Sequence, residues 1–467
     1  MGKTIVKNVE PIKKTEEKLE PILTEDGEAK WLIITKKKVF NENRPIKEII
    51  TDPLEPEIEP VFELRDQCIW ECLKCGNLIK SNPSPPVECY KDLGGCGRKS
   101  DFKMVTDEIV PLWSLPVWKD IPVEDLDMQN TYLDLKKLLK STLIFQEAIQ
   151  YDLFALWIIS TYKVERWNAI PFLIFRGLIS SGKTQALELA GKLGYRLMLA
   201  TGASFPAIVR ASHEYNAGLL IDEIDNKIDK RTENGRNYID FLKPSYKRGQ
   251  HYFTADLNNQ RKIQQYRNFG FKAFAGEKGG YDQAMFSRAI DFQMEQDYPE
   301  IYNLDKVKDE INRIKTILLN YRYKTNEPPQ IDDEIRLKGR NREIFECIIA
   351  TAMHIGIKHD NIIEYVEDVE KEKIEDFKST VEWEILNAIK NYENAETLDD
   401  APEIIDFKEL ADRLDWDYDR STGQKLGYII RKKFFLKTKR RKQGTVLLLN
   451  HKKNIRKLNY LYKRYKI

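Results

Sequence analysis

Runs of apolar residues along the chain predict the order of its buried elements. Phe172 to Phe175 is a short continuous apolar run, typical of a fully buried strand, and Leu219 to Ile221 is another. Apolar residues at helical spacing over Thr184 to Leu193 predict a helix after the first strand. Strand, loop, helix and second buried strand, in this order, indicate an α/β fold with an open sheet.

The C-terminal part shows a different order of elements. Phe407 to Leu414 and Leu426 to Ile430 carry apolar stripes at helical spacing, which predict two helices. Phe434 to Thr438 and Thr445 to Leu449 predict two strands joined by a turn. Helix, helix and hairpin are the outline of a winged helix. Residues 452–467 form a basic, aromatic tail for which we expect a final helix.

The other segments predict fewer elements. WLIITKKKVF predicts a strand, and TDPLEPEIEP predicts an extended linker because of its prolines. Residues 298–324 and 360–390 predict helices, the second acidic and connecting two domains. Expected domains are 1–60 (extension and linker), 61–106 (cysteine module), 107–300 (α/β core with helical lead-in), 301–390 (helical lid and connector) and 391–467 (winged helix).

Length and composition exclude several classes of protein. The chain has 467 residues, of which 42% are hydrophobic and 32% charged, so it can bury several cores and is neither disordered nor a small disulfide scaffold. Its longest strongly apolar stretch, Leu153 to Ser160, is too short to span a bilayer. The first residues lack the apolar core of a secretory signal. We therefore expect a soluble, cytoplasmic protein with no membrane partner.

Charge is distributed unevenly behind a net value of +2. Asp360 to Asp419 holds 21 acidic and 6 basic residues, whereas Arg420 to Ile467 holds 17 basic residues and no acid. A solvated helical face alternates its charges, so a block of one sign indicates a polyanion-binding end. The alternative is a basic tail that only aids solubility.

Four of the six cysteines lie in one short stretch. Cys72, Cys75, Cys89 and Cys96 have the spacing C-x2-C-x13-C-x6-C, and glycines beside Cys75 and Cys96 allow tight turns. Four thiolates complete a tetrahedral shell, which predicts a structural Zn²⁺ site without an open catalytic position. Cys68 is either a spare ligand or a packing residue.

The strongest motif follows the first buried strand. Gly177 to Thr184 is GLISSGKT, a GxxxxGKT loop between a strand and a helix, which is the context that a phosphate-binding loop requires. Gly177, Ser181 and Gly182 would let backbone N–H groups surround an anion. Lys183 would contact the β- and γ-phosphates of ATP, and Thr184 would supply a hydroxyl to Mg²⁺.

An acidic pair follows the second buried strand, in AGLLIDEIDN. Asp222 and Glu223 come at the carboxyl end of that strand, the edge at which open α/β sheets hold ligands. Asp222 can bind Mg²⁺ through water, and Glu223 can activate the attacking water. Together with the phosphate loop, the pair predicts an ATPase rather than a nucleotide kinase.

These motifs and their flanks resemble a known group. LFALWIISTYKVERWNAIPFLIFRG, SFPAIVRASHEYNAGLLIDEID, KPSYKRGQHYFTADL, FGFKAFAGEKGGYDQAMFSRAIDFQM and LKGRNREIFECIIATAMHIG are similar to successive segments of AAA+ replicative helicases. The group comprises proteins of phages, plasmids and integrated elements, related to superfamily 3 and minichromosome-maintenance helicases. The resemblance covers residues 140–357. It implies an AAA+ core that works as a homo-oligomeric ring, for which we expect a hexamer.

The resemblance also implies roles for single residues. Arg288 would be the arginine finger that reaches ATP on the neighbouring subunit, and Arg340 or Arg342 the lid arginine that senses nucleotide in its own subunit. Lys272 would be a sensor. Lys247 and Arg248 precede a hairpin that could present them to single-stranded DNA in the pore. Surface ion pairs and a solvated loop are the alternatives.

Basic residues of the expected winged helix suggest contacts with duplex or forked DNA. The helix would use Arg431 and Lys432, and the turn would use Lys439, Arg440, Arg441 and Lys442. Protein contacts are the alternative for this fold. We expect an ATP-dependent DNA helicase or translocase for replication of a virus or mobile element. The alternatives are an ATP-switched initiator or loader without unwinding activity, and a remodeller of protein partners.

Overall fold

The chain forms two compact units, Met1–Ile362 and Ile363–Ile467. A computed structural model describes residues 18–26, 29–39, 57–65, 68–72, 78–81, 102–106, 114–255, 263–277, 283–331, 335, 337, 339–395, 403–442 and 444–467. Each unit has its own buried core, and we describe them separately. In the described residues, no helix combines the length and apolarity needed to cross a membrane.

Two small antiparallel sheets precede the core of the first unit. In the first, β2 (Ala29–Val39) lies between β1 (Lys18–Leu23) and β3 (Glu57–Arg65). In the second, β4 (Cys68–Cys72) lies between β5 (Leu78–Ser81) and β6 (Phe102–Thr106). The domain boundary expected at residue 60 therefore falls inside β3, and the expected linker supplies its first four residues. Ile58, Phe62 and Leu64 lie an even number of positions apart, with charged residues among the positions between them. This is the period of a strand, and a strand forms there despite the prolines.

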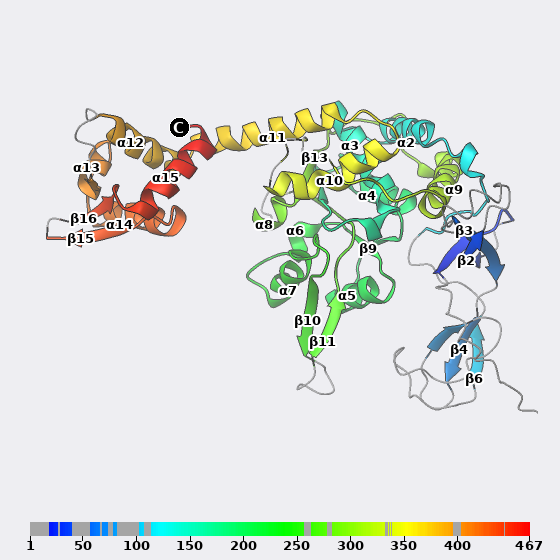
Figure 1. Ribbon diagram of the computed structural model, residues 1–467. Helices are drawn as coiled ribbons and strands as arrows, with labels where there is room; N and C mark the ends of the chain where they lie inside the picture. The colour runs from blue at the N-terminus through cyan, green and yellow to red at the C-terminus, as the bar shows by residue number, and fades with distance from the viewer. Residues whose placement is uncertain are drawn as a thin grey trace, which may run out of the picture. The chain divides into compact units, whose positions relative to one another are not determined.

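A five-stranded parallel sheet forms the centre of the first unit (Figure 1), which confirms the predicted α/β fold. The strand order is β13-β7-β12-β9-β8. The bounds are β7 (Phe172–Arg176), β8 (Leu197–Leu199), β9 (Gly218–Ile221), β12 (Lys272–Gly276) and β13 (Ala289–Gln293). Because β9, β12 and most of β7 are buried, they consist, apart from Lys272 at the start of β12, of the continuous apolar runs that such strands need.

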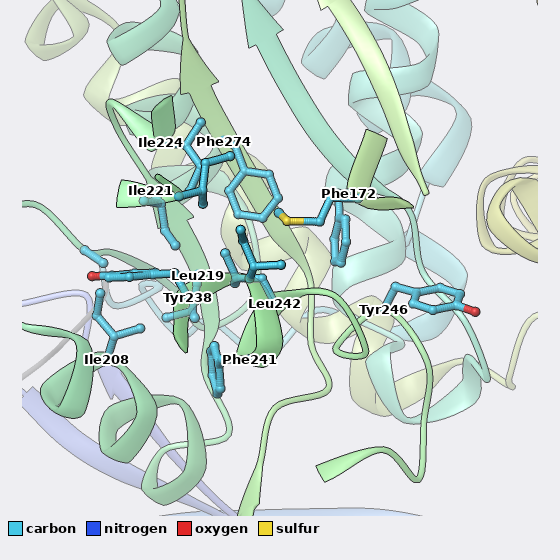
Figure 2. Close-up of a cluster of buried hydrophobic side chains, with 14 of the residues drawn as sticks. Phe172, Ile208, Leu219, Ile221, Ile224, Tyr238, Phe241, Leu242, Tyr246 and Phe274 are labelled. Carbon is cyan, nitrogen blue, oxygen red and sulfur yellow. The ribbon is translucent and has the colours of Figure 1, made fainter. Parts of the chain in front are cut away.

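Helices bury these strands. Side chains of α5 (Phe205–Glu214), α6 (Ile224–Lys227) and α7 (Glu233–Leu242) form an apolar cluster with Phe172, Leu219 and Phe274 of the sheet (Figure 2). The helix α3 (Ala148–Thr161) is apolar on all sides and fully buried from Leu153 to Ile159, as expected of a helix enclosed by others. The remaining helices of the unit are α2 (Met128–Thr142), α4 (Lys183–Leu193), α8 (Gln283–Phe286), α9 (Lys308–Lys324) and α10 (Gly339–His354).

A hairpin of β10 (His251–Ala255) and β11 (Ile263–Arg267) extends from the core beyond α5 and α7 (Figure 1). Its base is anchored by Tyr252, whose ring contacts Phe205 and Phe241 edge-on at centroid distances of 5.7 and 5.5 Å. Phe253 points the other way and is 58% exposed, and Ile263 is 76% exposed. The hairpin therefore presents apolar side chains to solvent.

The second unit contains the predicted two helices and hairpin. α13 (Phe407–Asp412) and α14 (Arg420–Tyr428) precede β15 (Thr438–Arg441) and β16 (Gly444–Leu448), and β16 also pairs with β14 (Ile404–Asp406). α12 (Val381–Ala395) and α15 (Lys452–Tyr465) pack into the same core, and α11 (Asp360–Lys378) runs into it. The expected connector ending at residue 390 thus ends inside α12, whose Ile385, Leu386 and Ile389 belong to this core.

The hairpin differs from its prediction in one respect. The first strand begins at Thr438 rather than Phe434, so Lys439, Arg440 and Arg441 lie in the strand. Phe434 and Leu436 are buried at the end of a π-helical turn, and Phe435 between them has a φ of +58°. That left-handed residue interrupts the alternation that an earlier strand start would need.

Candidate active site

The phosphate loop connects β7 to α4, and its two glycines are required by the backbone. A Cβ on Gly177 would lie 2.4 Å from Ser181 Oγ and 2.6 Å from the carbonyl oxygen of Met294. Gly182 has a φ of +86° at the N-terminus of α4, a conformation that glycine adopts at little cost. The loop therefore directs the free N–H groups at the start of α4 toward a common point.

Three side chains of the predicted site come together at the carboxyl end of the sheet. Thr184 Oγ1 donates a hydrogen bond to Asp222 Oδ2 at 2.7 Å, which joins the helix after β7 to the end of β9. Lys183 Nζ donates to the carbonyl oxygens of Gly177 and Leu178 at 2.8 and 2.6 Å, within its own loop. A hydroxyl and a carboxylate in contact are oxygen ligands of the kind that Mg²⁺ prefers.

Glu223 lies beside this pair in an unusual backbone conformation. Its φ is +50°, which is uncommon for a residue other than glycine, and its N–H donates to Asp222 Oδ1 at 2.8 Å. Asn226 Nδ2 donates to Glu223 Oε2 at 3.3 Å. Sequence reasoning missed Asn226, although its position one helical turn after Glu223 indicates that it can orient the carboxylate.

A pocket of about 690 Å³ adjoins the loop, a size typical of small-molecule sites. Its walls are residues Ser180 to Gln185, Thr142 to Ile144, and the segment after β13 that carries Tyr298 and Tyr302. These tyrosines are 93% and 79% exposed, and no sequence pattern marks them as residues of the site. The buried Ser181 Oγ has no hydrogen-bond partner among the described residues. The hydroxyl and the two exposed rings are groups that a phosphate and a nucleobase can contact.

Arg288 and Arg340 both pack against Tyr246 at the end of the sheet where the parallel strands begin, which is the end opposite the phosphate loop. Their guanidinium carbons lie 4.8 and 5.1 Å from the ring centroid, and Arg340 Nη1 donates to the tyrosine hydroxyl at 2.6 Å. The Phe172 N–H, at the start of β7, donates to the carbonyl oxygen of Arg288 at 3.0 Å. The five residues of β7 separate this edge from the phosphate loop by about 13 Å.

Neither arginine therefore contacts the phosphate loop of its own chain. The role of Arg288 as a finger that serves a neighbouring subunit stays a prediction. The half-buried guanidinium of Arg288 has an Nε without a hydrogen-bond partner in the described part of the chain. The placement of Arg340 does not support the expected role within its own subunit. Arg342 Nη2 donates to the carbonyl oxygen of Ile331 at 3.0 Å, a contact that holds the start of α10.

Lys247 and Arg248 precede β10 and do not lie on the hairpin itself. Lys247 Nζ pairs with Glu343 Oε1 at 2.5 Å, and this carboxylate raises the pKa of Lys247. Arg248 donates to the carbonyl oxygens of Trp167 and Val164, both at 2.8 Å. Lys247 and Arg248 therefore both have partners within the fold. The hairpin itself exposes the side chains of Phe253 and Ile263 instead.

Lys272 does not lie near the phosphate loop, so the structure does not support the expected role of a sensor. It begins β12 beside Phe172, at the edge opposite the phosphate loop, and is fully buried. Its Nζ donates to the carbonyl oxygens of Asn268 and Gly270 at 2.6 and 3.1 Å. Burial, with a smaller contribution from Arg267, lowers the pKa of Lys272 to about 7. The lysine therefore holds the chain that leads into β12.

The predicted DNA-contacting residues of the second unit are exposed. Arg431 and Arg440 line a groove of about 850 Å³ between α14 and the β15–β16 hairpin. Arg431 Nη1 lies 3.5 Å from Thr438 Oγ1 in the hairpin. Lys432, Lys439, Arg441 and Lys442 are also exposed.

The zinc prediction stays a prediction. Cys72 ends β4, but its side chain lies outside the described residues, as do Cys75, Cys89 and Cys96 altogether. Cys347 is fully buried in α10, as expected of a core residue.

No protein-family model and no curated protein matches the chain. Among solved structures, the A form of the apo NrS-1 C-terminal region has a TM-score of 0.35 and 12% identity, covering 73% of this chain and 78% of that one. A second apo structure of that region (residues 305–718) has a TM-score of 0.32 and 13% identity, covering 79% and 83%. Function has to be argued from the site.

Proposed function

We propose that the chain is an ATPase of the AAA+ class that acts on DNA in replication. The observation that supports this most is the hydrogen bond between Thr184 and Asp222, with Glu223 beside it and the phosphate loop next to it. The strand order also supports it, because β12, which lies in the FGFKAFAGEKGGYDQAMFSRAIDFQM segment of the resemblance, is placed between β7, before the phosphate loop, and β9, before Asp222. ATP and Mg²⁺ are the expected ligands.

In this proposal, ATP supplies the phosphoryl group and Mg²⁺ neutralises its charge. Lys183 would release its two loop carbonyls and donate to the phosphates, and Thr184 and Asp222 would hold the metal. Glu223 accepts the proton of the attacking water, and Asn226 keeps the Glu223 carboxylate in place. Tyr298 and Tyr302 provide faces for stacking the nucleobase.

Catalysis also requires a second copy of the chain. The transferring phosphoryl group carries charge that a guanidinium stabilises, yet Arg288 lies about 13 Å or more from its own loop. We propose that Arg288, together with Arg340 on the same tyrosine, faces the ATP of a neighbouring subunit. Subunits arranged head to tail in this way form a ring when the rotation between neighbours closes, which is the assembly that we propose.

DNA is the proposed partner of both units. The second unit has the element order of a winged helix, and the basic groove between α14 and the hairpin suits phosphates of duplex or forked DNA. The β10–β11 hairpin would contact single-stranded DNA in the ring. A zinc module formed by the four cysteines would stabilise the segment around β4, β5 and β6.

Strand displacement on a forked DNA substrate tests this function. A helicase separates the strands only with ATP and Mg²⁺, and Lys183→Ala protein does not. ATP-dependent binding without displacement would instead identify an initiator or loader. ATP hydrolysis that DNA leaves unchanged would favour a remodeller of proteins.

A further inference from the structure

The second unit carries an aromatic and basic surface that is separate from the groove between α14 and the hairpin. Phe435 is 72% exposed and Tyr460 is 51% exposed. Lys457 Nζ lies 5.9 Å from the ring centroid of Phe435 and 5.0 Å from that of Tyr460. Arg464 Nη1 donates to the Tyr460 hydroxyl at 3.0 Å. We call these four residues the α15 patch.

Packing of the unit does not explain the residue type at position 435. Phe434 and Leu436 are each only 3% exposed, and the Leu436 N–H donates to the carbonyl oxygen of Ile430 at 2.9 Å. The chain buries these neighbours by placing Phe435 in the left-handed region, which is costly for a bulky side chain. Asparagine or glycine would adopt this conformation more easily. Phe435 exposes an apolar ring despite that cost.

The side-chain charges of α15 itself have one sign, and Glu370 of α11 is an acidic residue that interacts with Arg464 from outside the helix. One face of α15 is buried through Asn454, Leu458, Leu461 and Tyr462. The other face exposes Lys452, Lys453, Arg456 and Lys463, and no acidic residue occurs after Asp419. The complementary ligand is therefore a polyanion. Exposed rings beside cations favour a polyanion whose flat groups are free to stack on them. Bases of a single strand are free in this way, whereas bases in a duplex are already stacked on one another.

We propose that the α15 patch binds single-stranded nucleic acid. One base stacks on Phe435 and another on Tyr460, and Lys457 and Arg464 contact the adjoining phosphates. A forked substrate would then place its duplex in the α14 groove and an unpaired strand on α15. The proposal does not rest on ATP hydrolysis, because both surfaces belong to the second unit and the test uses no nucleotide.

Photo-crosslinking of the full chain tests the proposal. An oligothymidylate of about 20 nucleotides that carries 5-iodouracil is irradiated with the protein, and crosslinked peptides are mapped by mass spectrometry. We expect crosslinks at Phe435 and Tyr460. They should disappear in the double variant Phe435→Ala/Tyr460→Ala. They should persist in Tyr428→Ala, which removes an exposed tyrosine of α14 instead.

Binding measurements separate stacking from general attraction. Phe435→Ala should weaken oligothymidylate binding about tenfold, whereas Phe435→Trp should retain it. For single-stranded DNA, Lys457→Gln should reduce the slope of the logarithm of the binding constant against the logarithm of the salt concentration by about 0.7. Duplex binding should stay unchanged in all three variants. Crosslinks that map only elsewhere, no crosslinks at all, or equal losses for duplex and single strand would overturn the proposal.

Discussion

Replacement of Arg288 by alanine tests chemistry and assembly together. The guanidinium lies across the sheet from its own phosphate loop, so the proposed finger would serve the ATP of a neighbouring subunit. Loss of an arginine finger costs about 10³ in rate, equivalent to about 4 kcal/mol of transition-state stabilisation. An arginine in an exposed ion pair contributes about 0–1 kcal/mol to stability and nothing to the rate. The two interpretations therefore differ by orders of magnitude.

The assay is steady-state ATP hydrolysis by Arg288→Ala protein, alone and mixed with Lys183→Ala protein. Each variant alone should be inactive, although Arg288→Ala should bind ATP normally. In an equal random mixture, about one quarter of the sites combine an intact loop with an intact finger from the neighbouring subunit, so about one quarter of the wild-type rate should return. Arg313→Ala, which breaks the exposed pair with Asp134, is the matched control and should stay active. Nearly full activity of Arg288→Ala alone, or no recovery on mixing, would refute the reasoning.

Four further predictions concern single residues. Glu223→Gln should bind ATP but hydrolyse it at least about 10²-fold more slowly, measured by nucleotide binding and turnover; normal turnover would exclude the role of water base. Purified protein should contain one Zn²⁺ per chain by elemental analysis, and Cys72→Ser or Cys75→Ser should lose it; metal-free wild type would refute this. Burial lowers the pKa of both Lys272 and Lys315 to about 7. Between pH 7 and 10 the unfolded chain therefore binds more protons than the folded chain does. The free energy of unfolding should rise with pH in this range, by up to about 1.4 kcal/mol per pH unit for each lysine. Lys272→Met should remove its share of that slope in urea unfolding, and an unchanged slope would contradict the depressed pKa. Glu20 is buried and accepts hydrogen bonds from Tyr195, Arg196 and Tyr323, so Glu20→Ala should destabilise the first unit by about 3 kcal/mol; an unchanged urea midpoint would contradict a role in stability.

Local patterns made the centre of the site predictable. The strand, glycine loop and helix around Gly177 to Thr184 are consecutive in sequence, and so are the buried strand and acidic pair at Asp222 and Glu223. Each needs only short-range information, and the carboxyl ends of parallel strands meet at one edge of the sheet. The contact between Thr184 and Asp222 follows from these two facts.

Long-range placement was not predictable in the same way. No pattern in the sequence around Lys272 shows that a strand begins at this residue rather than ending near it. Arg340 meets Tyr246 across 94 positions, and no local pattern indicates that contact. At the C-terminal hairpin, apolar alternation predicted a strand from Phe434, but the buried Asn454 binds the backbone of Lys437 and Leu448 and so helps fix the later start.

ATP hydrolysis with and without single-stranded DNA, measured side by side for wild type and Lys183→Ala, tests the proposed function most directly. We predict that wild-type protein hydrolyses ATP in the presence of Mg²⁺, that DNA increases its rate, and that Lys183→Ala shows neither activity. Hydrolysis that survives in Lys183→Ala, or that DNA does not change, would contradict a DNA-dependent ATPase built on this loop.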